Sequence, residues 1–220
     1  MVARFQENLN WLRRVPPLIE RTIINKNPDF PVPASIVLPN VGREAHSYLH
    51  HIVSRYDDLS AVSIFCQGHP FDHAFDFHAS LQEIAAHPEG VGDFRWLGHI
   101  IDTDDARGHT LFRTWSKNDD GCELDAHGFH RALFGCDGPE FYTFRLGAQF
   151  AVTRSQLRAR PLEFWKRALE VSVEFPDAAH CFERSWDRVV GVMEPDAIWL
   201  DGRKTAYLKP IKRLSENKNV

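Results

Sequence analysis

The sequence predicts a single α/β domain over residues 1–203, with a mixed, mostly parallel sheet flanked by helices, and a polar tail over 204–220. Strand-like and helical segments alternate through the first hundred residues, as they do in parallel sheets. The segment 61–66 is almost continuously apolar, which indicates a strand covered on both faces. No internal repeat and no Gly/Ser-rich linker divides the chain into two folding units.

Local patterns predict the elements of the N-terminal half. Short strands are expected over 2–5, 21–24, 34–38 and 61–66. A helical pattern over 9–15 stops at Pro16-Pro17, because proline cannot continue a helix. The strongest helix has apolar residues at i, i+3, i+4, i+7, i+8 and i+11, which are Ala45, Tyr48, Leu49, Ile52, Val53 and Tyr56. His46, His50 and His51 are expected on its surface, and a second helix begins near Asp76.

The C-terminal half has weaker periodicity. Strands are expected over 96–101 and 141–152, and helices begin at Pro161 and Asp177. The segment 107–140 is expected to form loops with short helical pieces. Asp102-Thr103-Asp104 has the spacing that holds a divalent ion and a diphosphate, but Asp-rich segments are also common turns, and the turn is the preferred interpretation.

Composition excludes several classes of protein. The chain has 220 residues, 43% hydrophobic and 25% charged, which are ordinary values for a globular domain. A formal charge of −4 removes the basic field that nonspecific nucleic-acid binding uses. No run approaches the roughly 18 apolar residues of a membrane span. Four cysteines without a CxxC pair exclude a ribbon-type zinc site and favour a reducing compartment, so a cytoplasmic location is expected.

Polar residues cluster where the predicted strands end, which is where ligands bind in open α/β sheets. The first strand is followed by Arg4, Gln6 and Glu7, and the third by Asn40, Gly42, Arg43 and Glu44. The second cluster opens the strongest helix, whose free N–H groups and dipole favour an anion. The alternative is an ordinary capped helix, with Asn40 at or near the cap and Glu44 as a first-turn acid.

A loop rich in potential ligands follows the strand over 61–66. It contains Gln67, His69, Asp72 and His73 within seven residues. Asp72, assisted by a histidine, is suited to Mn²⁺ or Mg²⁺. The alternative is that Asp72 caps the next helix and the histidines are surface residues.

Two further patterns carry less specific signals. His46 and His50 have the H-x-x-x-H spacing of a zinc pair, but Ser47 stands where zinc proteases have a catalytic Glu. Glu183 lies on a predicted helix beside an apolar stripe, where it is either a general base in a cleft or a solvated carboxylate paired with neighbouring arginines.

Several segments, taken together, resemble a known family. They include the opening V-A-R-F-Q-E-N-L-N-W and the loop F-C-Q-G-H-P-F-D-H, and they lie at 2–11, 38–49, 56–59, 65–73, 147–152 and 183–186. The chain resembles a family of small proteins of unknown function from fungi and bacteria. It is also similar to a virus-encoded glycosyltransferase domain of the GT-A type. The resemblance is dense over 1–75 and sparse over 141–190.

The resemblance implies a GT-A-like fold and a transferase that moves a sugar from a nucleotide-diphosphate donor to an unknown acceptor, with Mn²⁺ or Mg²⁺ on the diphosphate. It places Arg4, Gln6 and Glu7 against the nucleotide, and Asn40, Gly42, Arg43 and Gln67 also at the donor. Gly147 and Gln149 would border the sugar or acceptor. Asp72 and His73 would hold the metal, and Glu183 would act as general base. Gln67 and His69 stand where the family of such transferases has two acids.

Two other functions remain open from the residues alone. One is a metal-dependent hydrolase that uses the histidine-containing loops over 69–78 and 125–130. The other is a binding module for nucleotide sugars that has the fold without the reaction.

Overall fold

The computed structural model describes residues 1–115, 122–192 and 205–207. The strands are β1 (Val2–Arg4), β2 (Ile23–Asn25), β3 (Ile36–Val37), β4 (Val62–Gln67), β5 (Phe94–Trp96), β6 (Ile100–Asp105), β7 (Phe141–Arg145), β8 (Phe150–Thr153) and β9 (Thr205–Tyr207). The helices are α1 (Arg43–Ser54), α2 (Phe77–Ala86), α3 (Phe112–Trp115), α4 (Ala126–Phe134), α5 (Arg154–Arg158), α6 (Leu162–Glu174) and α7 (Ala178–Val190). Four 3₁₀ turns join them: η1 (Asn10–Arg14), η2 (Tyr56–Asp58), η3 (Pro70–Asp72) and η4 (Pro88–Val91).

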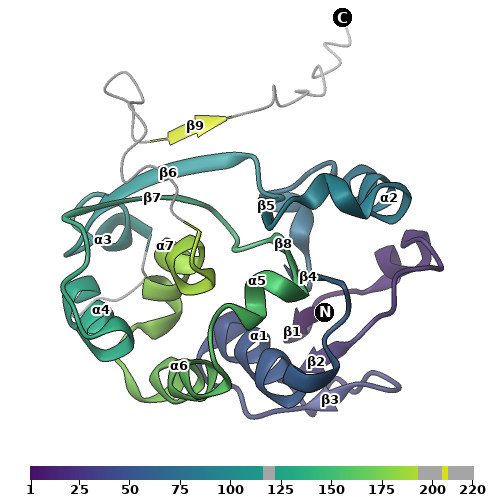
Figure 1. Ribbon diagram of the computed structural model, residues 1–220, viewed down its shortest axis with the longest axis horizontal. Coiled ribbons are helices and arrows are strands. Elements are labelled where there is room, and N and C mark those ends of the chain that lie inside the picture. Colours follow the sequence, from purple (N-terminus) through teal and green to yellow (C-terminus); the bar gives the residue numbers. More distant parts are fainter. Residues whose placement is uncertain (116–121, 193–204, 208–220) are drawn as a thin grey trace, which may run out of the picture.

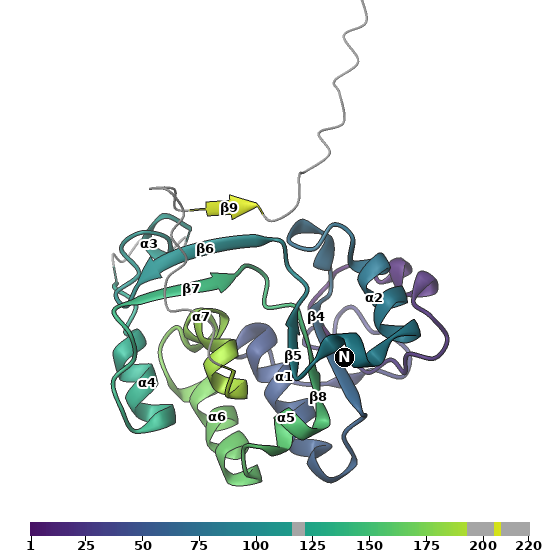
Figure 2. The same ribbon diagram turned by 45° about the horizontal axis from the view of Figure 1, so that its top comes forward.

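The main sheet is mixed and mostly parallel, as the sequence predicts. Its order is β3-β2-β1-β4-β8-β5. The pairs from β3 to β4 are parallel, and β8 runs antiparallel to both of its neighbours. A second, antiparallel sheet has the order β7-β6-β9 and crosses above α7 (Figure 2).

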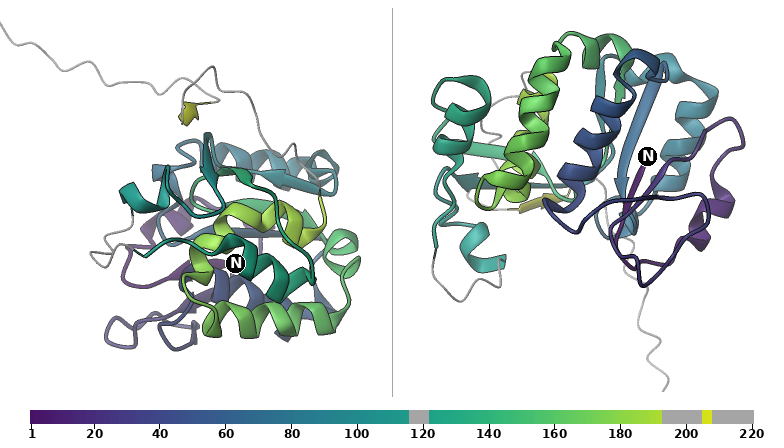
Figure 3. Two further views of the ribbon diagram at one scale, coloured as in Figure 1. Left: turned by 90° about the vertical axis from the view of Figure 1, so that its left-hand side faces the viewer. Right: turned by 90° about the horizontal axis from the view of Figure 1, so that it is seen from below.

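Both faces of the main sheet are covered, which explains the continuous apolar character of β4. Helices α1, α6 and α7 lie on one face, and α2 and η1 lie on the other (Figures 1 and 3). Successive residues of β4 alternate between the two cores: Phe65 packs with the first group of helices and Cys66 with the second. The sheet therefore separates two apolar clusters within one domain.

Helix α1 buries its predicted stripe, with Ala45, Tyr48, Leu49 and Ile52 fully enclosed. The prediction that His46 lies on the surface is wrong, because its side chain is buried, with Nδ1 3.3 Å from Nζ of Lys26 in the segment that follows β2. His50 and His51 are half-buried. The first turn of the helix approaches α6 so closely that a Cβ on Gly42 would collide with the carbonyl oxygen of Ser172.

Three predictions in the middle of the chain are wrong. The strand expected over 96–101 is two strands in different sheets, since β5 ends at Trp96 and β6 begins at Ile100. The strand expected over 141–152 is likewise divided between β7 in the second sheet and β8 in the main sheet. The turn expected at Asp102-Thr103-Asp104 lies inside β6, where it pairs with β7. The reason is tertiary: β7 supplies a partner strand to a polar segment, and Asp104 gains buried partners that are described below.

The C-terminal part is described only in pieces. Thr205–Tyr207 form β9 beside β6, within the segment for which the sequence predicts a tail. Residues 204 and 208–220 of that tail lie outside the described residues. In the described ranges, no helix is long and apolar enough to cross a membrane.

Candidate functional site

A cavity of about 510 Å³ lies at the carboxyl ends of β1, β2 and β4. It is lined by Ala3, Arg4, Phe5, Glu7, Lys26, Asn40, Arg43, Glu44, Gln67, His69 and Asp72. The chain runs outward from β1 to β2 and β3 on one side and to β4 on the other, so the strand order reverses here. Ligands of open α/β sheets bind at such switch points.

The cavity brings together six of the predicted site residues, which are Arg4, Glu7, Asn40, Arg43, Gln67 and Asp72. The other six, Gln6, Gly42, His73, Gly147, Gln149 and Glu183, lie outside its lining. Four chain segments, each following a different strand, contribute to the wall. The strand-end rule thus finds residues that are up to 68 positions apart in the sequence, from Arg4 to Asp72.

Arg4 builds the wall of the cavity. Its Nε donates to the carbonyl of Glu7 at 2.9 Å, and its Nη1 donates to Asn25 Oδ1 at 2.8 Å and to the carbonyl of Phe30 at 2.7 Å. These bonds tie together the segments that follow β1 and β2. The Arg4 guanidinium therefore brings a positive charge to the cavity, and its hydrogen bonds hold the wall in place.

Glu7 is held by the same segment. Its Oε2 accepts hydrogen bonds from the backbone N–H groups of Phe5 at 2.7 Å and Gln6 at 3.1 Å. A Cβ on Gly68 would come within 2.6 Å of this carboxylate oxygen, so a larger residue at position 68 would displace the Glu7 side chain. Gln6 is exposed and takes part through its backbone.

The first residues of α1 form another wall. Gly42 is the N-cap residue, with φ of 58°, and Arg43 follows with φ of 46°. Positive φ at a non-glycine residue is strained, and such strain concentrates at functional sites. The N-cap is Gly42 rather than Asn40, which lies two residues before it, and no side chain caps the helix; Glu44 lies in the first turn, as the capped-helix alternative expects. The helix start and the Arg43 side chain therefore both present positive charge at the cavity.

Two cavity residues, Lys26 and Glu44, were missed as functional groups by sequence reasoning. Lys26 is buried, and burial lowers its pKa to about 8, while the nearby Glu44 carboxylate opposes the shift. Its Nζ donates to the carbonyl of Val41 and lies 3.3 Å from His46 Nδ1. Lys26 directly follows β2, so the same strand-end rule that selects Arg4 would have selected it.

Glu44 is a half-buried carboxyl group next to a second carboxylate. Burial, and then the negative charge of Glu183, raise the pKa of Glu44 to about 7. The Glu183 side chain is held in place by a hydrogen bond, since its Oε1 accepts from the backbone N–H of Gly147 at 2.8 Å. Glu44 lines the cavity and Glu183 does not, although the two carboxyl groups interact electrostatically.

Of the predicted sugar-binding residues, Gly147 contacts Glu183 through its backbone N–H. Gly147 has φ of 84°, and a Cβ there would come within 2.5 Å of His73 Cδ2. Gln149 is 0% exposed, and neither its amide oxygen nor its amide nitrogen has a hydrogen-bond partner among the described residues. His73 thus packs against Gly147 rather than lining the cavity with Asp72.

The loop after β4 supplies donors suited to a metal. His69 Nδ1 lies 3.3 Å from Asp72 Oδ2, and both side chains are exposed at the cavity. The alternative that Asp72 caps the next helix is wrong, because α2 begins at Phe77. Within the described ranges, no three His, Cys, Asp or Glu side chains group so as to hold a metal by themselves. A Mg²⁺ ion held by one carboxylate and a substrate diphosphate would not need such a group.

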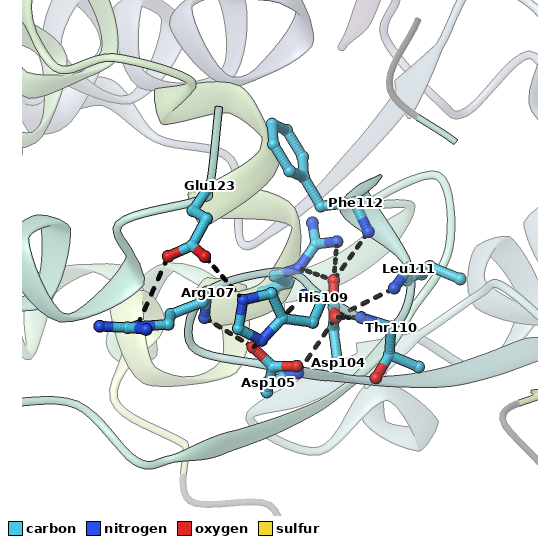
Figure 4. Close-up of polar contacts among 9 residues, drawn as sticks. Asp104, Asp105, Arg107, His109, Thr110, Leu111, Phe112 and Glu123 are labelled. Carbon is cyan, nitrogen blue, oxygen red and sulfur yellow. Dashed lines mark hydrogen bonds and ion pairs between the residues drawn. The ribbon is translucent and has the colours of Figure 1, made fainter. Parts of the chain in front are cut away.

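Asp104 is a structural carboxylate (Figure 4). Its Oδ1 accepts from the N–H groups of Thr110 at 3.1 Å and Leu111 at 3.0 Å, and its Oδ2 accepts from Phe112 N at 3.0 Å. Oδ2 also accepts from Arg184 Nη2 at 2.6 Å. These bonds occupy the carboxylate and fix the segment between β6 and α3. The D-x-D pattern is therefore part of the fold, in the second sheet, whereas the cavity lies at the strand ends of the main sheet.

The two loops of the hydrolase alternative do not share a site. His69 belongs to the cavity described above, whereas His127 lines a different cavity of about 870 Å³ and lies 3.8 Å from Glu140. His130 is buried, and neither ring nitrogen has a partner among the described residues. Burial lowers the pKa of His130 to about 4, helped by the charge of Arg188.

Comparison with known proteins gives one match. Residues 1–87 match the model of a family described as "Protein of unknown function (DUF3431)". This region contains all of the residues that line the cavity, from Ala3 to Asp72. No curated protein and no solved structure matches the chain.

Proposed function

We propose that the chain is a glycosyltransferase-like enzyme that transfers a sugar from a nucleotide-diphosphate donor to an acceptor, with the diphosphate bound in the cavity. The observation that carries the proposal is the convergence of Lys26, Arg43 and the start of α1 at the sheet switch point. Lysine and arginine are common phosphate ligands, and a helix start binds anions. Lys26 and Arg43 line the same cavity, beside the start of α1, and a bound diphosphate would lie among them.

The charge balance of the cavity favours an anion despite its acids. The Glu7 carboxylate already accepts two backbone N–H groups. The Glu44 carboxyl, with a pKa of about 7, is about half protonated at neutral pH. Lys26, with a pKa of about 8, is mostly charged there, and Arg43 is always charged. Asp72 remains at the open side of the cavity.

Asp72 and His69 are the residues that would hold Mn²⁺ or Mg²⁺ against the diphosphate. The bound ion would neutralise charge on the leaving diphosphate. One carboxylate suffices because such ions keep waters and take phosphate oxygens as further ligands. His69 stands where the resembled transferases have an acid, so a weaker metal contribution is expected than with two carboxylates.

Glu44 and Glu183 supply the base. The acceptor hydroxyl oxygen forms a bond to the anomeric carbon, and its proton passes to a carboxylate of this pair. The bond between the anomeric carbon and the diphosphate oxygen breaks, and its electron pair leaves with the nucleoside diphosphate. Glu44 receives the proton because it lines the cavity, and burial, together with the negative charge of Glu183, keeps the pKa of Glu44 near neutrality.

Nucleotide binding is tested by thermal unfolding with UDP, GDP or dTDP, with and without Mn²⁺. A ligand at 100 times its Kd stabilises the fold by about 2.7 kcal/mol, which raises the Tm of a domain of this size by about 5–10 °C. Lys26→Met should abolish the rise, and Lys166→Met, an exposed lysine on α6, should keep it. If no nucleoside diphosphate at millimolar concentration raises the Tm of the unsubstituted protein, the proposal is wrong.

Metal and chemistry are tested separately. Asp72→Ala should remove the part of the Tm rise that depends on Mn²⁺, and the exposed Asp58→Ala should not. Hydrolysis of a nucleotide sugar distinguishes an enzyme from a binding module, and the release of nucleoside diphosphate measures it. Binding without any turnover would support the module instead.

A cytoplasmic location is part of the proposal and is supported by four free cysteines.

A further inference from the structure

A buried contact joins Lys26, which lines the cavity at the strand ends, to His46 in the first turn of α1. Nζ of Lys26 lies 3.3 Å from Nδ1 of His46. The two residues are 5% and 8% exposed, so water has little access to either. The proposed sugar transfer uses Lys26 and gives His46 no role.

The chemistry of the two groups determines the direction of this hydrogen bond. A lysine ammonium group has three N–H donors and no acceptor. Lys26 is mostly charged at neutral pH, so its Nζ donates and His46 Nδ1 accepts. A neutral imidazole carries one ring proton, which therefore lies on Nε2. The contact specifies one tautomer of His46.

His46 keeps its acceptor at neutral pH. Burial, followed by the positive charge of Lys26 and the neighbouring His50, lowers the pKa of His46 to about 4. Protonation of Nδ1 would remove the acceptor and place two positive charges side by side. The charge of Lys26 also opposes a zinc ion on His46 and His50, the pair that the H-x-x-x-H spacing suggests.

Two uncharged acceptors hold the Lys26 ammonium. Nζ donates to the carbonyl of Val41, which precedes α1, and to Nδ1 of His46 within the helix. Two of the three N–H donors are thereby used, and the third remains for a phosphate oxygen. Neither acceptor neutralises the ammonium, so its charge acts on an anion in the cavity. A lysine side chain held in this way loses little conformational entropy when a ligand binds.

Packing at the start of α1 fixes the position of His46. Its backbone N–H donates to the carbonyl of Gly42 at 3.0 Å. A Cβ on Gly42 would come within 2.9 Å of His46 Cβ and would also collide with the carbonyl oxygen of Ser172 in α6. The imidazole is therefore attached to a closely packed part of the backbone and offers its acceptor at a constant place.

We propose that His46 is a positioning residue, which holds the Lys26 ammonium at the cavity through a hydrogen bond accepted by Nδ1 and thereby strengthens the binding of a diphosphate. The effect on the diphosphate rests on the proposed function, whereas the hydrogen bond does not. Without this acceptor a buried ammonium loses one of its partners, which favours the neutral amine and frees the side chain to adopt other rotamers. A neutral or displaced Lys26 binds a phosphate anion less tightly.

The hydrogen bond is tested in the full chain without any ligand. Nitrogen NMR of isotope-labelled histidine distinguishes a protonated from an unprotonated ring nitrogen. Nδ1 of His46 should be unprotonated, and Lys26→Met should shift its resonance toward that of a nitrogen without a hydrogen-bond donor. A protonated Nδ1, or a resonance that Lys26→Met leaves unchanged, overturns the inference.

Calorimetric titration with inorganic pyrophosphate and Mg²⁺ tests the role in anion binding. His46→Leu should weaken binding about tenfold, because the bond it removes involves a charged group. His46→Asn should restore most of the affinity, since the asparagine Oδ1 is as many bonds from Cα as the histidine Nδ1. The matched control is His50→Leu, one turn further along α1, which should change the affinity by less than about twofold.

The outcomes separate this inference from the proposed function. If His46→Leu binds pyrophosphate as tightly as the unsubstituted protein does, the inference is overturned. An equal loss in His46→Leu and His46→Asn overturns it too, because it indicates that the imidazole acts only through packing. If the unsubstituted protein does not bind pyrophosphate, the proposed function is refuted and the NMR result alone decides the inference. Urea unfolding of each variant establishes that the protein is folded during the titration.

Discussion

Replacing Arg184 by methionine should strongly destabilise the protein. Arg184 and Asp104 are 3% and 1% exposed, and they join α7 to β6 across 80 residues of sequence. Arg184 donates to Asp104 Oδ2 from Nη2 at 2.6 Å and from Nε at 3.2 Å. Methionine removes the guanidinium, whose central carbon lies 4.7 Å from the centre of the Phe144 ring, and leaves the Asp104 carboxylate with its backbone donors alone.

The expected loss follows from these contacts. Removing one partner of a buried ion pair costs about 3–5 kcal/mol. Asp104 keeps bonds to backbone N–H groups, so the lower end of about 3 kcal/mol applies. This is a large part of the 5–15 kcal/mol that typically stabilises a domain. The Tm should fall by about 6–12 °C for a protein of this size.

Urea unfolding followed by circular dichroism measures the loss. The matched control is Arg167→Met, an exposed arginine on α6, which should change the free energy of unfolding by less than about 0.5 kcal/mol. The double variant with Asp104→Asn completes a thermodynamic cycle and should show a large coupling energy. If Arg184→Met costs less than about 1 kcal/mol, then the pair does not hold α7 to β6 and the reasoning is refuted.

Three further predictions test the site and the fold. Glu44→Gln should abolish donor hydrolysis while nucleotide binding persists, and a normal rate in this variant refutes the assignment. In the unsubstituted protein the rate of hydrolysis should fall as the pH drops below about 7, and Glu183→Gln should shift this fall to lower pH. His130 has a folded pKa of about 4 against 6.5, so its stabilising contribution is present above pH 6.5 and is lost as the pH falls toward 4. His130→Phe should therefore raise the Tm at pH 5 relative to the unsubstituted protein and change it little at pH 8; an equal change at both pH values contradicts this. Gly147→Ala should destabilise by about 1–3 kcal/mol because of its positive φ, while Gly90→Ala, with open space around it, should be neutral in the same denaturation experiment.

Local sequence patterns were sufficient for much of the fold. The stripe from Ala45 to Ile52 specifies α1, because apolar side chains at helical spacing have to be buried on one face. The apolar run of β4 predicted a sheet covered on both faces, which Phe65 and Cys66 confirm by packing into opposite cores. Burial of His46 could not be predicted from the helical pattern, since its ring lies against Lys26, which belongs to the segment after β2.

The strand-end rule located the cavity but did not rank its residues. It selected Arg4 and Asp72 correctly as cavity residues, and it would have selected Lys26 if each strand end had been treated alike. It could not reveal the raised pKa of Glu44, because that depends first on burial by the tertiary structure and then on the charge of Glu183, 139 residues away. Glu183 itself does not line the cavity, and its carboxylate accepts a hydrogen bond from Gly147 instead.

The sequence by itself determined the α/β class, the stripe of α1 and the polar strand ends, because each depends on residues a few positions apart. Only the tertiary structure decided which polar residues share a site and which support the fold. The Asp102–Asp104 segment shows the reason: a turn by local pattern, it is a strand because β7 pairs with it and because Arg184 neutralises Asp104. Charge pairing over such distances has no local signature, so the same carboxylate spacing fits a metal site and a buried ion pair equally well.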